Sequence, residues 1–348
     1  DGVPVADLEL WDDRLAGFAT SEKVALALEL ERRVRAGDAR IRAGAGRECG
    51  EEGKRVALGG RTSINEASRR TTCYLAADVV AGAGDDTQTG DGFTVGRCPA
   101  DLDAEAAARD AIERSTRMLG ASKPPSARID VVLDRRVTAT LLAILAGTLS
   151  GEEVAKGRSL FAGRVGEEVA VERLTLVDDP TDPRAFGAAT VDAEGLACRR
   201  NALVEGGRLT GFLYDSYSAR LAGTRSTGSA VRAGFKSTPG VGARALYLVP
   251  GDLDQEGIVA LVGEGLLVQG ISGVHSGVNP VSGDFSVGAE GLVIRGGSLA
   301  EPVREITVAS TIQRMLQHVI AVGADVEWLP SSAAGVSLAI GDIAMSGD

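Results

Sequence analysis

Apolar residues recur at helical spacing in four segments of the chain, and each segment predicts an amphipathic helix. The first covers residues 20–37, where Thr20 or Ser21 supplies the cap and Gly37 the stop. The others cover residues 101–119, residues 135–149 and residues 311–323. The positions expected to face the core are Val24, Leu26, Leu28, Leu30 and Val34 in the first helix, and Val137, Leu141, Ile144, Leu145 and Thr148 in the third.

Other segments are enriched in β-branched residues and bounded by glycine, which predicts strands. These are residues 54–60, 62–82, 93–97 and 129–134, with residues 82–92 as a turn-rich connection. Later in the chain, residues 202–223 and 291–316 each predict a strand, a Gly-Gly turn, a second strand and a helix. Because strands and helices do not alternate strictly, we expect an α+β fold of mostly antiparallel sheets with a few helices.

The pair Pro124-Pro125 lies among small polar residues between two patterned segments and marks the best candidate domain boundary. We therefore expect an N-terminal α+β domain over residues 1–121 and a C-terminal domain over residues 126–348. The chain begins on an extended-looking segment without Met, so we expect the first domain to be incomplete at its start.

Charge and cysteine usage limit the partners and the compartment. The net charge of -11 argues against nucleic acid or an anionic membrane as a partner, because both attract basic surfaces. No apolar run reaches the ~18 residues of a membrane-spanning helix. The four cysteines are far apart and form no C-x-x-C pair, which is typical of reduced thiols, so we expect a cytoplasmic protein.

Common catalytic motifs are missing from the sequence. The two histidines, His275 and His318, lie 43 positions apart and neither begins an H-E-x-x-H pattern, so we expect no metal site in this chain. "GVHSG" is not a G-x-S-x-G elbow, and neighbouring residues such as His275 and Ser276 rarely form a catalytic dyad. "GDGFTVG" precedes no helix and does not match a dinucleotide-binding loop.

One segment combines a histidine with many glycines: "QGISGVHSGVNPVSGDFSVGAEGLVI", residues 269–294. Glycines at this density permit positive φ and close approach of another backbone. Asn279-Pro280 and Ser282-Gly283-Asp284 predict turns between two strands. The exposed backbone could pair with an extended peptide by strand addition, or the loop could make only internal contacts. The pattern leaves both interpretations open.

Several motifs in the same order resemble the TldD/PmbA family, whose bacterial and archaeal members are associated with peptide processing. They are "KGRSLFAGRVGEEVAVERLTLVDDP" (156–180), "LTGFLYDSYSARLAGTRSTGSA" (209–230) and "SGVNPVSGDFSVGAEGLVIRGGSLAEPVREITVAS" (276–310). The resemblance covers about residues 20 to 345 and implies the two-domain fold of that family.

The resemblance also implies that two types of subunit in this family have different roles. TldD-type members carry a zinc-binding His-Glu-x-x-x-His helix and a cysteine ligand further on. Here Ala143, Ile144 and Thr148 stand at the helix positions, and "WLPSSAAGVSL" lacks the cysteine. The chain therefore resembles the PmbA (TldE) type, which implies a heterodimer with a TldD-like subunit that holds zinc and encloses a peptide-cleaving chamber.

We therefore expect a metal-free subunit of a zinc peptidase that acts on unfolded or small peptides. The residues expected to face substrate or partner are His275, Asn279, Gly283, Asp284 and Phe285 and, as a second group, Tyr214, Tyr217 and Arg220. None is assigned a catalytic role. On this interpretation, Gly277→Val should reduce peptide turnover without unfolding the chain.

Two other functions remain open on the sequence. One is a binding or regulatory module without a proteolytic purpose. The other is a biosynthetic protein recruited to modify a peptide-like natural product.

Overall fold

A computed structural model describes residues 2–59 and 65–347 of the chain. It divides into two compact units, one formed by Glu9–Ala57 and Ala67–Ser122 and the other by Lys123–Asp348 with Asp1–Leu8 and Leu58–Glu66. Gly60 and residues 62–64, which belong to predicted strands, lie outside the described residues. The domain boundary at Pro124-Pro125 remains a prediction.

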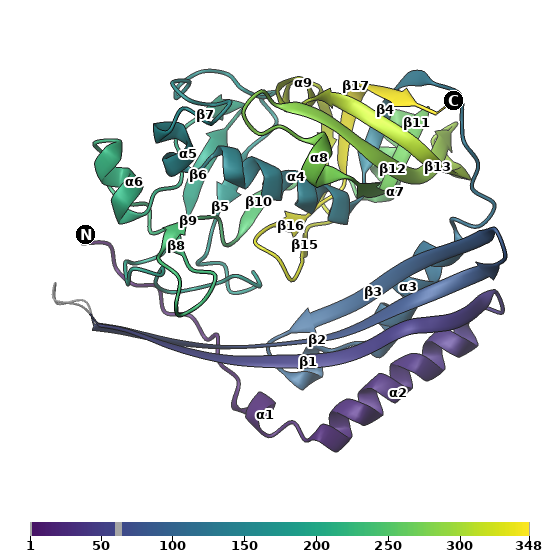
Figure 1. Cartoon of the computed structure of the whole chain (residues 1–348), viewed down its shortest axis with the longest axis horizontal. Helices are drawn as coiled ribbons and strands as arrows, with labels where there is room; N and C mark the ends of the chain where they lie inside the picture. Colours follow the sequence, from purple (N-terminus) through teal and green to yellow (C-terminus); the bar gives the residue numbers. More distant parts are fainter. Residues whose placement is uncertain (1, 60–64, 348) are drawn as a thin grey trace. The chain divides into compact units, whose positions relative to one another are not determined.

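The first unit packs two long helices on one face of a three-stranded sheet of order β1-β2-β3 (Figure 1). Its core joins side chains of α2, β2 and α3, among them Leu30, Leu75 and Ala107. The elements of this part of the chain are α1 (Asp13–Ala16), α2 (Thr20–Gly37), β1 (Ile41–Gly59), β2 (Asn65–Ala83), β3 (Asp86–Gly96), the 3-10 helix η1 (Pro99–Asp101) and α3 (Ala104–Thr116).

Helix α2 has the predicted length, but its cap and its buried face differ from the prediction. Neither Thr20 nor Ser21 is the N-cap: this is Ala19, whose N–H donates to Glu22 Oε2 at 2.9 Å. Val24 and Leu28 are 52% and 59% exposed. Four of the five predicted core positions follow one another at intervals of two residues, so they point to different sides of the helix. Only Leu26, Leu30 and Val34, which are four residues apart, share the face that packs against the core.

Strand β3 begins at Asp86, six residues before the end of the turn-rich connection predicted over residues 82–92. The turn is confined to Ala83–Asp86, and the rest of that prediction was wrong. The glycines that suggested a turn have a packing role instead. A Cβ at Gly90 or Gly92 would clash with the backbone of α3. Glycine at these positions lets the helix lie directly against the strand.

The second unit contains all elements from β4 onward. They are β4 (Ala127–Leu133), α4 (Arg135–Thr148), α5 (Gly151–Ala155), β5 (Leu176–Asp178), β6 (Asn201–Glu205), β7 (Arg208–Leu209), α6 (Ser216–Leu221), β8 (Ala230–Val231), β9 (Gly240–Val241), β10 (Leu246–Leu248), α7 (Gln255–Val262), β11 (Gly265–Ser272), α8 (Val274–Gly277), β12 (Asp284–Arg295), β13 (Ser298–Thr311), α9 (Ile312–Gln317), β14 (Val319–Val322), β15 (Glu327–Trp328), β16 (Ala334–Gly335) and β17 (Leu338–Ser346).

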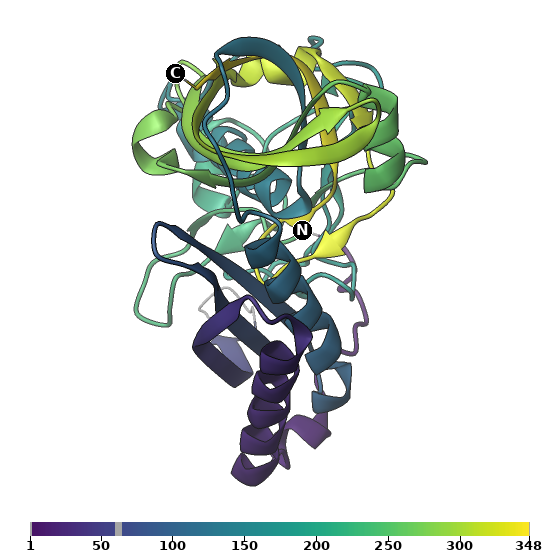
Figure 2. The same cartoon turned by 90° about the vertical axis from the view of Figure 1, so that its right-hand side faces the viewer.

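The main sheet of this unit closes on itself. Its order is β13-β12-β11-β4-β17-β14, and β13 also pairs with β17, so five strands form a barrel that is seen end-on in Figure 2. All pairs are antiparallel except β4 with β11. The barrel strands all contribute to one apolar core, for example through Val131, Leu266, Val287, Val303 and Leu338. A second sheet has the order β10-β5-β6-β7.

The two Gly-Gly hairpins are confirmed. Gly206 and Gly207 have φ of 55° and 76° between β6 and β7, and Gly296 and Gly297 have φ of 56° and 74° between β12 and β13. Positive φ at both central residues matches the twist of a two-residue hairpin. The strand and helix predicted at residues 129–149 are confirmed as β4 and α4, with Val137, Leu141, Leu145 and Thr148 buried. The observed architecture is the predicted α+β class with mostly antiparallel sheets.

No helix among the described residues is long and apolar enough to cross a membrane.

Candidate functional site

Helix α4 carries the three positions at which the family resemblance expects zinc ligands. Ala143 is exposed and Ile144 packs partly against the core. Thr148 is buried, and its Oγ1 donates to the carbonyl of Leu145 at 2.8 Å. Hydrocarbon side chains have no lone pair for a metal, and zinc sites in proteins use His, Cys, Asp or Glu. These three residues do not fit a zinc ion.

The acidic, cysteine and histidine side chains elsewhere do not gather into a substitute site. Over residues 2–59 and 65–347, no three of them lie together as metal ligands would. His318 was predicted within a helix, but α9 ends at Gln317 and strand β14 follows at Val319. The β-branched residues after His318 pair with β17 instead of continuing the helix. His318 Nδ1 lies 3.9 Å from Asp342 Oδ2.

His275 lies in a short helical turn rather than in an open loop. Gly273, with φ of 74°, begins this turn, α8, and its carbonyl accepts from the N–H groups of Ser276 and Gly277. The side chain of His275 is exposed. Ser276 Oγ donates to the carbonyl of Gly273 at 3.2 Å, so the hydroxyl is engaged with backbone. The segment offers an exposed imidazole beside a fixed backbone.

The turn after α8 is held by its own polar side chains. Asn279 Oδ1 accepts from the N–H of Val281 at 2.9 Å and of Ser282 at 3.2 Å, and Ser282 Oγ donates to Asp284 Oδ2 at 2.6 Å. Gly283, with φ of 84°, accepts from the N–H of Ile312. Asn279 and Asp284 are exposed, so they both shape this turn and present polar groups at the surface.

Phe285 lies on the inner side of the same segment. Its side chain is 6% exposed and packs in the barrel core, so it stabilises the turn from the interior of the barrel. Gly277 is also tightly placed, because a Cβ there would clash with the carbonyl oxygen of Ser286. Gly277→Val is therefore expected to disturb the fold of the turn, contrary to the expectation from the sequence.

The second group of predicted residues lies around α6. Asp215 caps this helix, with its Oδ1 accepting from the N–H of Ser218 at 2.7 Å. Tyr214 is half-buried and makes an edge contact with Phe212 at 6.4 Å between ring centres, and burial raises the pKa of its hydroxyl. Tyr217 and Arg220 are exposed. Figure 1 shows α6 and α8 well apart in this unit, so the structure does not bring the two groups together.

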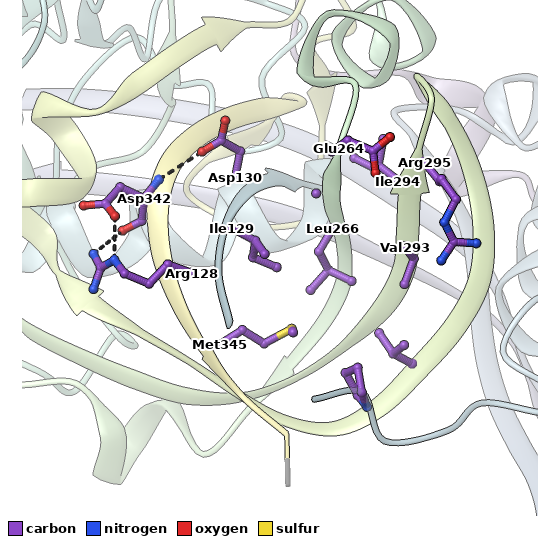
Figure 3. Close-up of a pocket in the computed structure, with 13 residues that line it drawn as sticks. Arg128, Ile129, Asp130, Glu264, Leu266, Val293, Ile294, Arg295, Asp342 and Met345 are labelled. Carbon is purple, nitrogen blue, oxygen red and sulfur yellow. Dashed lines mark hydrogen bonds and ion pairs between the residues drawn. The ribbon is translucent and has the colours of Figure 1, made fainter. Parts of the chain in front are cut away.

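A cavity of about 540 Å³ opens at one mouth of the barrel (Figure 3). Its floor is apolar, with Ile129, Leu266 and Met345 pointing inward from three strands. At the rim, Arg128 Nε donates to Asp342 Oδ1 at 2.6 Å, and this bond holds the pKa of Asp342 down at about 2. The rim carboxylate is therefore ionised and paired at neutral pH, which does not suit it for proton transfer.

The sequence did not indicate this cavity. It depends on the pairing of β13 with β17, whose partners lie nearly 40 positions apart, as in Thr307 and Ser346. A pattern of apolar positions shows which face of a strand is buried, but not which distant strand closes the sheet. Arg225, which lies beside Arg220 at a smaller cleft, was also missed, although it lies only a few residues beyond the predicted helix.

Two family models match this chain. The PmbA/TldA metallopeptidase central domain matches residues 13–119, and the PmbA/TldA metallopeptidase C-terminal domain matches residues 126–347. The chain belongs to the TldD/PmbA family. This confirms the family suggested by the sequence motifs.

Two relatives of this chain carry the name metalloprotease. A metalloprotease of Methanothermobacter thermautotrophicus is 33% identical over 225 residues, which are 64% of this chain and 49% of the relative. Metalloprotease PmbA of Escherichia coli O157:H7 is 27% identical over 323 residues, which are 92% of this chain and 68% of that protein. The chain thus spans about half the length of the archaeal relative.

The fold of this family member is similar to that of a solved relative. The crystal structure of TldE from Thermococcus kodakarensis superposes with a TM-score of 0.85 at 24% identity, over 93% of this chain and 74% of that one. The two-domain fold expected from the resemblance is therefore confirmed.

Proposed function

We propose that this chain is the metal-free subunit of a heterodimeric TldD/PmbA-type zinc metallopeptidase that degrades or matures unfolded or small peptides. The proposal rests on helix α4. Ala143, Ile144 and Thr148 stand there at the positions of the family's zinc ligands, and none of them offers a ligand for zinc. The names of the relatives support a peptidase role, and the likeness to TldE supports a TldD-like partner.

In this proposal the partner subunit would hold the zinc, and the chemistry that zinc would supply there is polarisation of the scissile carbonyl and activation of water. The part of this chain is to bind and orient the peptide. Extended peptides are recognised largely through main-chain hydrogen bonds, which require no catalytic side chain. We assign this role to residues 270–291, where His275, Asn279 and Asp284 are exposed around a turn fixed by internal bonds.

We also propose that the complex works in the cytoplasm. The four cysteines, Cys49, Cys73, Cys98 and Cys198, are all free thiols, and reduced cysteines are typical of that compartment.

Reconstitution with a TldD-like protein of the same organism tests this function. We expect the mixture to form a complex by size-exclusion chromatography and to cleave an unfolded peptide, while this chain alone does not cleave it. The control is a partner whose His-Glu-x-x-x-His glutamate is changed to glutamine, which should assemble but remain inactive. Cleavage by this chain alone would contradict the proposal, and assembly without cleavage would favour a binding or regulatory module.

A further inference from the structure

A cleft of about 390 Å³ lies between α6 and the segment that follows it. Figure 1 shows α6 at the edge of its unit. The floor is formed by Leu196 and Ala219, and the walls carry two guanidinium groups and three hydroxyl groups, from Arg220, Arg225, Ser216, Thr224 and Ser226. None of the described residues that line this cleft carries a carboxylate, so its lining is positively charged although the whole chain carries a net charge of -11.

The two guanidinium groups are not neutralised by any residue that the structure describes. Within the described part of the chain, neither Arg220 nor Arg225 forms an ion pair or a side-chain hydrogen bond. Two carboxylates of the same region are already engaged with backbone: Glu194 Oε2 accepts from the N–H of Ser216 at 2.8 Å, and Asp215 Oδ1 accepts from Ser218. The arginines therefore remain available to an anion from outside.

Other cavities of the molecule differ in this respect. At the barrel mouth, Arg128 pairs with Asp342 and Arg295 pairs with Glu301. In the groove between α2 and α3, Arg32 and Arg33 pair with Glu29, and only the exposed Arg109 has no carboxylate partner among the described residues. Arg128, Arg295, Arg32 and Arg33 thus have carboxylate partners, whereas both arginines beside α6 have none among the described residues.

The walls of the cleft are fixed in place by backbone contacts. The N–H of Thr224 donates to the carbonyl of Ala219 at 2.9 Å, and Gly223, with φ of 65°, turns the chain between them. On the other side, the guanidinium of Arg199 donates to the carbonyls of Ser226 at 2.7 Å and Thr227 at 3.0 Å. A cleft whose backbone is held on both sides loses little freedom when a ligand binds.

Hydroxyl groups complete the lining of the cleft. The hydroxyls of Ser216 and Thr224 make no hydrogen bond within the described residues, while Ser226 Oγ donates to the carbonyl of Tyr214 at 3.1 Å. Tyr217 and Leu221, one helical turn apart on α6, are 53% and 55% exposed. These two side chains belong to the same helix as Arg220 but do not line the cleft, whose apolar lining is Leu196 and Ala219.

We propose that this cleft binds a carboxylate of a peptide, with Arg220 and Arg225 as its anion-binding residues. Planar guanidinium groups bind carboxylates through paired charge-assisted hydrogen bonds, and free hydroxyls add donors. The choice of a peptide as the source of the carboxylate rests on the proposed function. The carboxylate is either the C-terminal group or an acidic side chain, and the experiment distinguishes these sources.

Fluorescence polarisation with the full chain tests the proposal. Three probes carry the uncharged dansyl label at the N-terminus: tetra-alanine with a free C-terminal carboxylate, tetra-alanine amide, and the amide of Ala-Ala-Asp-Ala. We expect at least one carboxylate-bearing probe to bind about tenfold or more tightly than tetra-alanine amide. Tight binding of the first identifies the C-terminal carboxylate, and tight binding of the third identifies the acidic side chain.

The double variant R220Q/R225Q should reduce binding of the carboxylate-bearing probe to the level of tetra-alanine amide. The matched control, Arg109→Gln, removes the same charge from an exposed position on α3 and should bind as the native chain does. Equal binding of all three probes by the native chain would overturn the proposal without any variant. Unchanged binding by R220Q/R225Q would overturn it as well.

These outcomes are independent of the proposed function. Binding is measured on the chain alone, so failure to assemble with a TldD-like partner would leave a carboxylate preference standing. A peptidase complex with no such preference would instead contradict only the inference about the cleft.

Discussion

Gly277 determines the geometry of the turn that follows α8. Its position leaves no room for a Cβ, because the carbonyl of Ser286 lies against it. We expect Gly277→Val to lower the free energy of unfolding by about 1–3 kcal/mol, as overpacking typically does. Urea unfolding followed by circular dichroism measures this change.

Gly211→Val is the matched control for Gly277→Val. A Cβ at Gly211 meets nothing within 4 Å, and its φ is not in the left-handed region. This substitution should leave the free energy of unfolding nearly unchanged. Equal stability of the two variants would show that the turn adapts to a larger residue.

Single residues of the site could be predicted only in part. The glycine spacing and the Asn-Pro and Ser-Gly-Asp turns indicated an exposed segment, and His275, Asn279 and Asp284 are exposed. The burial of Phe285 could not be derived from the loop itself, because it depends on where β12 begins. A residue at the boundary of a loop and a strand is exposed or buried according to register.

At the scale of elements, the close contact of α3 with β3 depends on glycine. We expect Gly92→Val to lower the free energy of unfolding by about 3 kcal/mol or more, because the new side chain would meet the backbone of α3 around Ala107 and Ala111. The loss is measured by thermal and urea unfolding.

The control for Gly92→Val is Gly147→Ala on α4, where a Cβ meets nothing within 4 Å. Alanine in a helix should stabilise the protein by about 0.5–1 kcal/mol. If Gly92→Val were as stable as the native chain, the glycines of β3 would not determine the packing of α3.

Helix α4, whose apolar positions follow a period of 3.6 residues, was predicted well, and strands rich in glycine were not. The row Val137, Leu141, Leu145 in α4 is buried as its spacing predicted. By contrast, β3 begins at Asp86, within residues 82–92, whose glycines indicated a turn. Glycine in a strand makes room for a neighbouring backbone, and a sequence pattern does not distinguish that use from a turn.

At the scale of the whole molecule, stability depends on a buried carboxylate. Asp178 is 0% exposed, and burial raises its pKa from 3.8 to about 6, although its Oδ1 accepts from the N–H groups of Arg244 and Ala245. The folded state therefore binds this proton more tightly than the unfolded state. Stability from Asp178 is fully present below pH ~3.8 and is lost as pH rises through about 6.

Asp178→Asn should remove most of this pH dependence. The native chain is expected to lose roughly 2 kcal/mol between pH 4 and 7 through this group, since one pKa unit corresponds to about 1.4 kcal/mol and the titration begins below pH 4. Burial also raises the pKa of Asp192, so a smaller slope of the same sign should remain in the variant. Urea unfolding at several pH values measures both slopes.

Asp252→Asn serves as the control for Asp178→Asn, because it makes the same change at an exposed position. It should keep the pH slope of the native chain. A slope in Asp178→Asn as steep as in the native chain would contradict the role of the buried carboxylate.

The family and the fold class could be predicted from motifs and periodicity, but the closed barrel could not. The barrel results from contacts between β13 and β17, and local patterns contain no information on such pairing. The motifs in residues 156–310 carried the family assignment, which the matches to both domain models confirm.

We expect this chain to hold no zinc of its own. The most direct test is elemental analysis of the purified full chain, prepared without chelator and with zinc supplied. We predict less than ~0.1 zinc per chain, because Ala143, Ile144 and Thr148 provide no ligand. About one tightly bound zinc per chain would contradict this expectation and would mean that the chain is a metalloenzyme in its own right.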